Sequence, residues 1–181
     1  PVIAPTTGLD ALLDDVRADA SHIEVLRPSV ETAAFAFDAG TAPRRASAGD
    51  GPAVAFPASP AEVQQLVRLA ARHGVSIVPR GAGTGLSGGA TASADQLVIS
   101  TARLDRIVEV SPADEVAVVE PGVLNAALNE RLEPLGLFYA PDPASWRIST
   151  IGGNIATNAG GLRCAKYGVT RESVLALDVV L

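Results

Sequence analysis

Residues 59–90 read SPAEVQQLVRLAARHGVSIVPRGAGTGLSGGA, in which a helix pattern, an apolar run and a glycine-rich run follow one another directly. The helix signal is strong, because Ser59 stands at the N-cap, Pro60 at the first helical position, and Glu62 completes a capping box. Gly74 is a C′ stop, so the sequence predicts a helix that ends there. The apolar residues that recur along it at helical spacing are Val63, Leu66, Val67 and Ala70.

Short apolar runs flank this helix. Residues 52–56 (PAVAF) form the first expected strand, and residues 75–79 (VSIVP) follow the helix as a buried strand. The helix between them is long enough for a right-handed parallel crossover. Residues 96–100 (QLVIS) predict a further strand, and residues 106–110 and 115–120 predict a hairpin around the turn SPAD.

Other segments give weaker signals. Residues 8–20 predict a short surface helix, residues 39–51 a loop, and residues 123–136 a helix that begins after a Pro-Gly pair. The last nine residues, 173–181 (SVLALDVVL), stop inside a β-branched run without a turn signal. They predict a strand cut from its continuation, and so a fragment.

Composition limits the chemistry. The chain has 181 residues, with 14 Lys+Arg against 20 Asp+Glu and a formal charge of −6, which does not favour nucleic acid as a partner. The amino terminus lacks a basic leader, and no apolar run approaches the roughly 18 residues of a membrane span, so we expect a cytoplasmic protein. Cys164 is the only cysteine, so any redox chemistry requires a bound cofactor.

Glycine is concentrated in two clusters. Five glycines at 81, 83, 85, 88 and 89 follow the expected strand directly, so backbone N–H groups can line one concavity that binds phosphate. In residues 149–161 (STIGGNIATNAGG), glycines alternate with Asn154 and Asn158, which can donate and accept hydrogen bonds. Two such loops suit a diphosphate and a flat ring.

Two common nucleotide motifs do not fit. The string GTGLSG at 83–88 satisfies GxGxxG, but only seven residues separate Gly89 from the strand core at Leu97. A crossover helix cannot fit there, which excludes a Rossmann unit. No lysine follows the glycines, so the Walker pattern also fails.

Three motifs together resemble a known family. Residues 78–90 (VPRGAGTGLSGGA), 139–161 (YAPDPASWRISTIGGNIATNAGG) and 164–170 (CAKYGVT) are similar to the FAD-binding (PCMH-type) domain of the vanillyl-alcohol oxidase superfamily. The closest branch is that of D-2-hydroxyacid dehydrogenases and glycolate oxidase flavin subunits. The resemblance implies an α+β fold, with a small parallel-strand and helix subdomain followed by a mainly antiparallel sheet subdomain with helices, truncated at its C-terminus.

The resemblance also implies domains and site residues. Residues 1–50 would be an N-terminal helix and loop, and residues 51–181 an incomplete FAD-binding domain. The FAD pyrophosphate would be held by Pro79, Arg80, Gly81, Ala82, Gly83, Thr84 and Gly85. The flavin would contact Pro141, Asp142, Thr150, Gly152, Gly153, Thr157, Asn158 and Gly160. Relatives with covalent flavin often have His where Thr84 stands, so FAD should be noncovalent.

The implied activity is oxidation of a 2-hydroxy acid, such as glycolate or D-lactate, to the 2-oxo acid by hydride transfer to flavin N5. The catalytic His, the carboxylate-binding Arg and any metal ligands are expected in a C-terminal substrate domain outside this chain. We therefore assign no catalytic residue and no metal site, and expect the chain alone to be inactive. An electron acceptor or partner subunit is a further expected partner. The alternative is a noncatalytic flavin or nucleotide-binding module.

A few remaining residues have structural interpretations. His73 is expected to contact the end of its helix, and Cys164 to be inert. Trp146 and Tyr139 fit flavin contact and core packing equally well. The pair at 166–167, Lys-Tyr, is assigned to structure.

Overall fold

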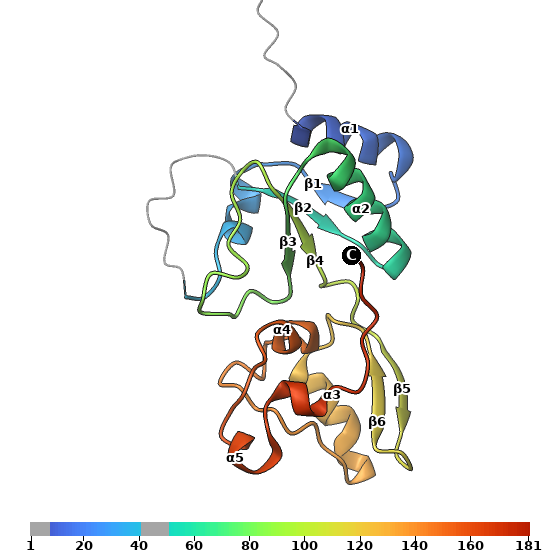
Figure 1. Cartoon of the computed structure of the whole chain (residues 1–181), viewed down its shortest axis with the longest axis vertical. Coiled ribbons are helices and arrows are strands. Elements are labelled where there is room, and N and C mark those ends of the chain that lie inside the picture. The colour runs from blue at the N-terminus through green and yellow to red at the C-terminus, as the bar shows by residue number, and fades with distance from the viewer. Residues whose placement is uncertain (1–7, 41–50) are drawn as a thin grey trace, which may run out of the picture. The chain divides into compact units, whose positions relative to one another are not determined.

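A computed structural model describes residues 8–40 and 51–181 of the chain. The chain forms two compact units (Figure 1). Unit 1 comprises Pro1–Arg80, Leu86–Ser100 and Val180–Leu181, and unit 2 comprises Gly81–Gly85 and Thr101–Val179.

Unit 1 is built on a four-stranded sheet of order β1-β2-β4-β3. The strands are β1 (Glu24–Leu26), β2 (Ala53–Phe56), β3 (Ile77–Arg80) and β4 (Leu97–Ser100). Both β2 and β3 pair with β4 in parallel, so the predicted parallel crossover is confirmed, with β4 inserted between its two strands. At the other edge β1 pairs with β2 in antiparallel orientation.

The crossover helix α2 (Pro60–His73) has the predicted ends. Ser59 Oγ accepts a hydrogen bond from Glu62 N at 3.2 Å, while the Glu62 carboxylate accepts from Ala58 N at 2.8 Å. Gly74 adopts φ +64°, and its N–H together with that of Val75 closes a Schellman motif on the last turn. Backbone groups at both ends of the helix therefore have hydrogen-bond partners in residues close by in the sequence.

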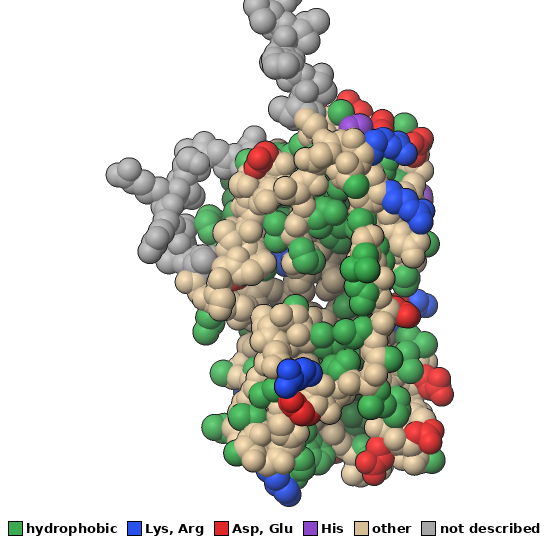
Figure 2. Space-filling model, in the orientation of Figure 1, with side chains coloured by type: hydrophobic (Ala, Val, Ile, Leu, Met, Phe, Trp, Pro, Cys, Tyr) green, Lys and Arg blue, Asp and Glu red, His purple; other side chains and the backbone are tan. Residues whose placement is uncertain are grey.

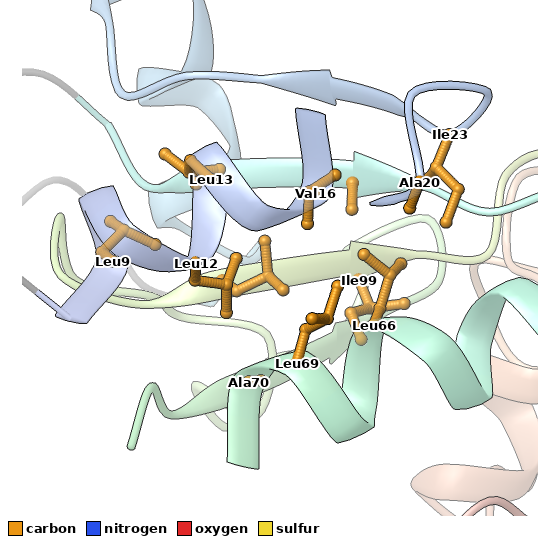
Figure 3. Close-up of a cluster of buried hydrophobic side chains, with 13 residues drawn as sticks. Leu9, Leu12, Leu13, Val16, Ala20, Ile23, Leu66, Leu69, Ala70 and Ile99 are labelled. Carbon is orange, nitrogen blue, oxygen red and sulfur yellow. The ribbon is translucent and has the colours of Figure 1, made fainter. Parts of the chain in front are cut away.

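The two faces of this sheet have separate cores, because side chains alternate along each strand. One face carries Ala53 and Ala55 from β2 with Leu97 and Ile99 from β4. It is covered by α2 and by α1 (Gly8–Asp19), whose leucines meet those of α2 (Figure 3). The opposite face carries Val54, Val78 and Val98, packed with Phe35 of the 3-10 helix η1 (Val30–Ala36).

Unit 2 contains the predicted hairpin of β5 (Ile107–Ser111) and β6 (Val116–Val119). Helix α3 (Asn125–Leu132) follows and continues into η2 (Glu133–Leu135), which ends at Gly136. The later elements are α4 (Ile151–Ala156), α5 (Cys164–Tyr167) and η3 (Thr170–Ser173). The apolar core lies between the hairpin, α3 and α4.

The fold class is confirmed, and several elements differ from expectation. Strand β1 was not predicted and precedes the expected first strand. Residues 75–79 were expected to be a buried strand, but β3 lies at a sheet edge. The C-terminal strand expected at 173–181 is wrong, because 174–181 is neither helix nor strand. Most of the loop expected at 39–51 lies outside the described residues.

The surface adds two observations. The C-terminal segment exposes several apolar side chains to solvent, as the green areas of Figure 2 illustrate. These side chains are those of Leu175, Leu177, Val179 and Leu181. Among the described helices, none has the length and apolar character needed to cross a membrane.

Candidate functional site

The first glycine cluster begins where β3 ends. Pro79 and Arg80 are the last residues of β3 and belong to unit 1. Arg80 Nη1 donates to Phe37 O at 2.7 Å and to Ala90 O at 3.2 Å, and its guanidinium lies 5.5 Å from the centre of the Phe35 ring. Burial lowers the pKa of Arg80, partly offset by the charge of Asp38. The side chain therefore fixes the start of the loop from within unit 1.

Residues 81–85 form the loop itself and belong to unit 2. Within the described part of the chain, none of their N–H groups donates to a protein acceptor. Gly83 adopts φ +71°, a region that L side chains rarely enter. A Cβ built on Gly81 would meet Thr150 Oγ1. The loop therefore approaches the second cluster closely and has donors that can bind an anion.

The second glycine cluster is not wholly the loop that the sequence predicts, because residues 151–156 form α4. Thr150 is the N-cap, and its Oγ1 accepts from Gly153 N at 3.2 Å. A Cβ on Gly152 would lie 2.6 Å from Pro121 Cβ, so this glycine permits packing between backbones. Asn154 faces the interior and is only 2% exposed.

A cleft of about 380 Å³ opens beside the loop within unit 2. Its lining is mostly small or apolar, and Asp105 is the charged residue in it. The lining residues are Gly81, Ala82, Ala102, Asp105, Ile107, Gly122, Val123, Leu124, Ala127 and Thr150. The cleft therefore joins the first predicted motif to the start of the second.

An ion pair fixes the wall that carries Asp105. Glu120 is 8% exposed and accepts from Arg106 N at 2.9 Å, from Nε at 3.0 Å and from Nη2 at 2.7 Å. The hydrogen bonds from Arg106 hold the pKa of Glu120 below its ordinary value, although burial opposes them. Glu120 N donates to Arg106 O at 3.0 Å and Gly122 N donates to Leu104 O at 2.7 Å, so backbone hydrogen bonds also join the segments at 104–106 and 120–122.

The start of α3 and the residues before it anchor the second motif through the backbone. Asn125 N donates to Ser149 O at 3.0 Å, and Ala126 N donates to Trp146 O at 3.2 Å. In the reverse direction, the N–H groups of residues 151 and 152 donate to the carbonyls of residues 123 and 121, each at 2.8 Å. The position of α4 thus depends on the turn that lines the cleft.

Pro141 and Asp142 lie in a stretch that is neither helix nor strand. Pro141 O accepts from Asn125 Nδ2 at 2.9 Å. Asp142 Oδ1 accepts from Arg163 N at 3.0 Å, and a Cβ on Gly161 would meet Asp142. Asn125 and its neighbour Asn129 were not predicted as site residues, and their signal in the sequence is a pair of amides four residues apart in a helix.

The remaining predicted contacts follow α4. The Thr157 hydroxyl donates to Gly153 O at 3.0 Å. Asn158 has φ +47°, and its Oδ1 accepts from Arg171 N at 2.9 Å, so this side chain holds η3. A Cβ on Gly160 would lie 3.2 Å from Val169. These contacts show how residues 157–160 are held, and leave their flavin roles as proposals.

Three buried polar atoms in unit 2 have no hydrogen-bond partner among the described residues. They are Tyr139 Oη, Ser149 Oγ and Asn154 Nδ2. Burial raises the pKa of Tyr139, and the nearby Thr170 and Asn154 side chains offset part of the rise. Tyr139 also packs on the unit 2 core, which favours the core interpretation.

The other singled-out residues have local partners. His73 ends α2 as expected, and its Nε2 lies 2.8 Å from Asp15 Oδ2, a partner that the sequence did not predict. Cys164 is a free, half-buried thiol. Lys166 Nζ lies 2.9 Å from Tyr167 Oη. The described residues contain no group of three or more His, Cys, Asp or Glu side chains that could hold a metal ion.

Several known proteins are similar to this chain in sequence. The chain is 45% identical over 129 residues to the glycolate oxidase subunit GlcD of Bacillus subtilis, covering 71% of this chain and 27% of that protein. It is 44% identical over 128 residues to a D-2-hydroxyglutarate dehydrogenase of Stutzerimonas stutzeri, covering 71% and 28%. A D-lactate dehydrogenase of Anaerostipes hadrus is 41% identical, covering 66% and 25%. The chain thus spans about a quarter of the length of these relatives.

The fold has a counterpart among solved structures. An alkyldihydroxyacetonephosphate synthase superposes with a TM-score of 0.74 at 23% identity, covering 93% of this chain and 35% of that one. The family described as FAD binding domain matches residues 52–181. That match takes in both glycine clusters and the cleft between them, and the chain therefore belongs to the FAD binding domain family.

Proposed function

We propose that this chain is the FAD-binding part of an oxidoreductase that converts a 2-hydroxy acid to a 2-oxo acid. The observation that carries the proposal is the loop at 81–85, whose N–H groups have no acceptor among the described residues and which borders a cleft of about 380 Å³. Bound FAD supplies a two-electron acceptor for the hydride of the substrate. Relatives named for glycolate, D-lactate and D-2-hydroxyglutarate support the substrate class.

The loop at 81–85 suits the pyrophosphate for a physical reason. The chain has a net charge of −6, so attraction to an anion must come from local dipoles rather than from the overall field. Consecutive free N–H groups provide such dipoles. The adjoining cleft has room for a neighbouring part of the dinucleotide.

The second motif would contact the flavin. In this proposal Pro141, Asp142 and Thr150 lie along it, and the residues of the second cluster that pack against its ribityl and ring portions are Gly152, Gly153, Thr157, Asn158 and Gly160. Thr84 has no imidazole to attack the flavin, so the cofactor is held without a covalent bond. The substrate-binding residues and the catalytic base are assigned to a part of the protein outside this chain. The electron acceptor or partner subunit is a further proposed partner.

The test uses the full polypeptide that the gene encodes. Anaerobic mixing with glycolate, D-lactate or D-2-hydroxyglutarate should bleach the visible absorption band of the bound flavin. A control without substrate should keep its colour. Bound FAD that no 2-hydroxy acid reduces would contradict the enzymatic part and favour a noncatalytic flavin-binding module.

A further inference from the structure

Helix α3 has two asparagines, Asn125 and Asn129, whose side-chain amides are buried or half-buried and do not cap the helix. Asn125 is 1% exposed and Asn129, one turn later, is half-buried. Asn125 is the first residue of α3, but the N-cap is Leu124 and no side chain caps this helix end. Burying an amide without hydrogen-bond partners costs free energy, so we expect both side chains to have such partners, and these partners indicate the role of the pair.

The two amides bind each other and then a neighbouring segment. Asn129 Nδ2 donates to Asn125 Oδ1 at 3.0 Å and to Asn125 O at 3.1 Å. Asn125 Nδ2 donates to Pro141 O at 2.9 Å, and Asn129 Oδ1 accepts from Tyr139 N at 3.0 Å. Every bond joins residues of unit 2. We call this pair the amide clip.

Among the described residues, the backbone of the segment that the clip holds is otherwise hydrogen-bonded only at its ends, where Leu137 N donates to Leu132 O and Pro143 O accepts from Trp146 N. Residues 137–143 are neither helix nor strand, so their backbone groups lack a ladder partner. The clip satisfies one donor and one acceptor of this segment, on either side of Ala140. The next residue, Asp142, then fixes Arg163 N at 3.0 Å. Side chains therefore replace a neighbouring strand here.

We infer that Asn125 and Asn129 are positioning residues for the flavin, acting through the segment at 139–142. This inference rests on the proposed function, in which Pro141 and Asp142 contact the flavin. Loss of the clip frees the segment to move, so affinity for FAD falls although the clip itself touches no cofactor. A purely structural role would lower stability alone.

Substitutions at Asn129 test the inference in the full polypeptide. Asn129→Ala removes the acceptor of Tyr139 N, whereas Asn129→Asp keeps an oxygen there and loses the donor to Asn125. Leu128→Ala is the matched control, because Leu128 is 3% exposed on the same helix and packs in the unit 2 core. Hydrogen exchange of the Tyr139 amide without FAD and titration with FAD are the two measurements.

We expect Asn129→Ala to lose the exchange protection of the Tyr139 amide and to bind FAD at least tenfold more weakly. Asn129→Asp should keep protection and bind with intermediate affinity, and Leu128→Ala should keep both while unfolding at a lower temperature. Wild-type affinity in Asn129→Ala, or an equal loss in Leu128→Ala, would overturn the inference. Absence of FAD binding by the wild type would instead overturn the proposed function.

Discussion

Gly81 and Gly83 are restricted for different physical reasons. At Gly81 a side chain has no space, because its Cβ would meet Thr150 Oγ1. At Gly83 the restriction is conformational, since φ is +71°. A side chain at Gly81 would push against the Thr150 hydroxyl that caps α4, whereas one at Gly83 would strain the loop backbone. Gly83 is therefore the position where substitution should affect the ligand before it affects the core.

We predict that Gly83→Val weakens FAD binding by about tenfold or more, because a β-branched residue resists this backbone region at a cost of roughly 1–2 kcal/mol. Gly89→Ala is the control, since a Cβ there would have no neighbour within 4 Å. Titration of both variants with FAD is the measurement. Equal affinities in the two variants would remove the anion-binding role of the loop.

Glu120 gives a prediction about pH. Its folded-state pKa is lowered by Arg106, so its contribution to stability is present above the ordinary glutamate range and is lost as the pH falls through the lowered value. We predict that Glu120→Gln lowers the denaturation midpoint at pH 7, and that the difference from wild type shrinks toward pH 3. Urea denaturation across this range is the measurement. A difference independent of pH would contradict the ion pair as its cause.

Among the elements, α2 has the best-defined ends. We predict that Ser59→Ala destabilises the fold by about 1 kcal/mol, because the Oγ that accepts from Glu62 N is lost. Gln64→Ala, on the exposed side of the same helix, is the control and should change stability little. Urea denaturation compares the two variants, and an equal loss in both would contradict the cap.

Local signals explain which elements could be predicted from the sequence. Capping residues, helical spacing and turn residues lie next to the structure they determine, so α2, the β5–β6 hairpin and the end of α3 were predicted. Strand β1 has only three residues and becomes a strand through pairing with β2, a contact distant in sequence. Helix α4 was missed because its two glycines disfavour a helix, while anchoring by residues 121–125 supports it.

The candidate site was predicted only in part, for the same reason. The glycine loop could be recognised because its pattern is contiguous. The amide clip depends on the approach of α3 to residues 139–141, and the Glu120–Arg106 pair forms at the open end of the β5–β6 hairpin, beyond its strands. Polar residues in a helix or at a strand end are common, so their partners become visible only in the fold.

For the whole molecule, we expect the flavin to be bound without a covalent link to the protein. We predict that acid precipitation of the holoprotein releases all its FAD to the supernatant, because Thr84 offers no imidazole and Cys164, the single thiol of this chain, is assigned to packing. The absorbance of supernatant and pellet is the measurement. Colour that stays in the pellet would show a covalent link and would point first to Cys164.

The most direct test of the account is a titration of the flavin-free full polypeptide with FAD and, separately, with riboflavin, followed by flavin fluorescence. The loop at 81–85 and its cleft are assigned to parts of FAD that riboflavin lacks. We therefore predict saturable binding of one FAD per chain and much weaker binding of riboflavin. Equal affinity for the two ligands, or no saturable binding of FAD, would contradict the claim that this chain holds the dinucleotide.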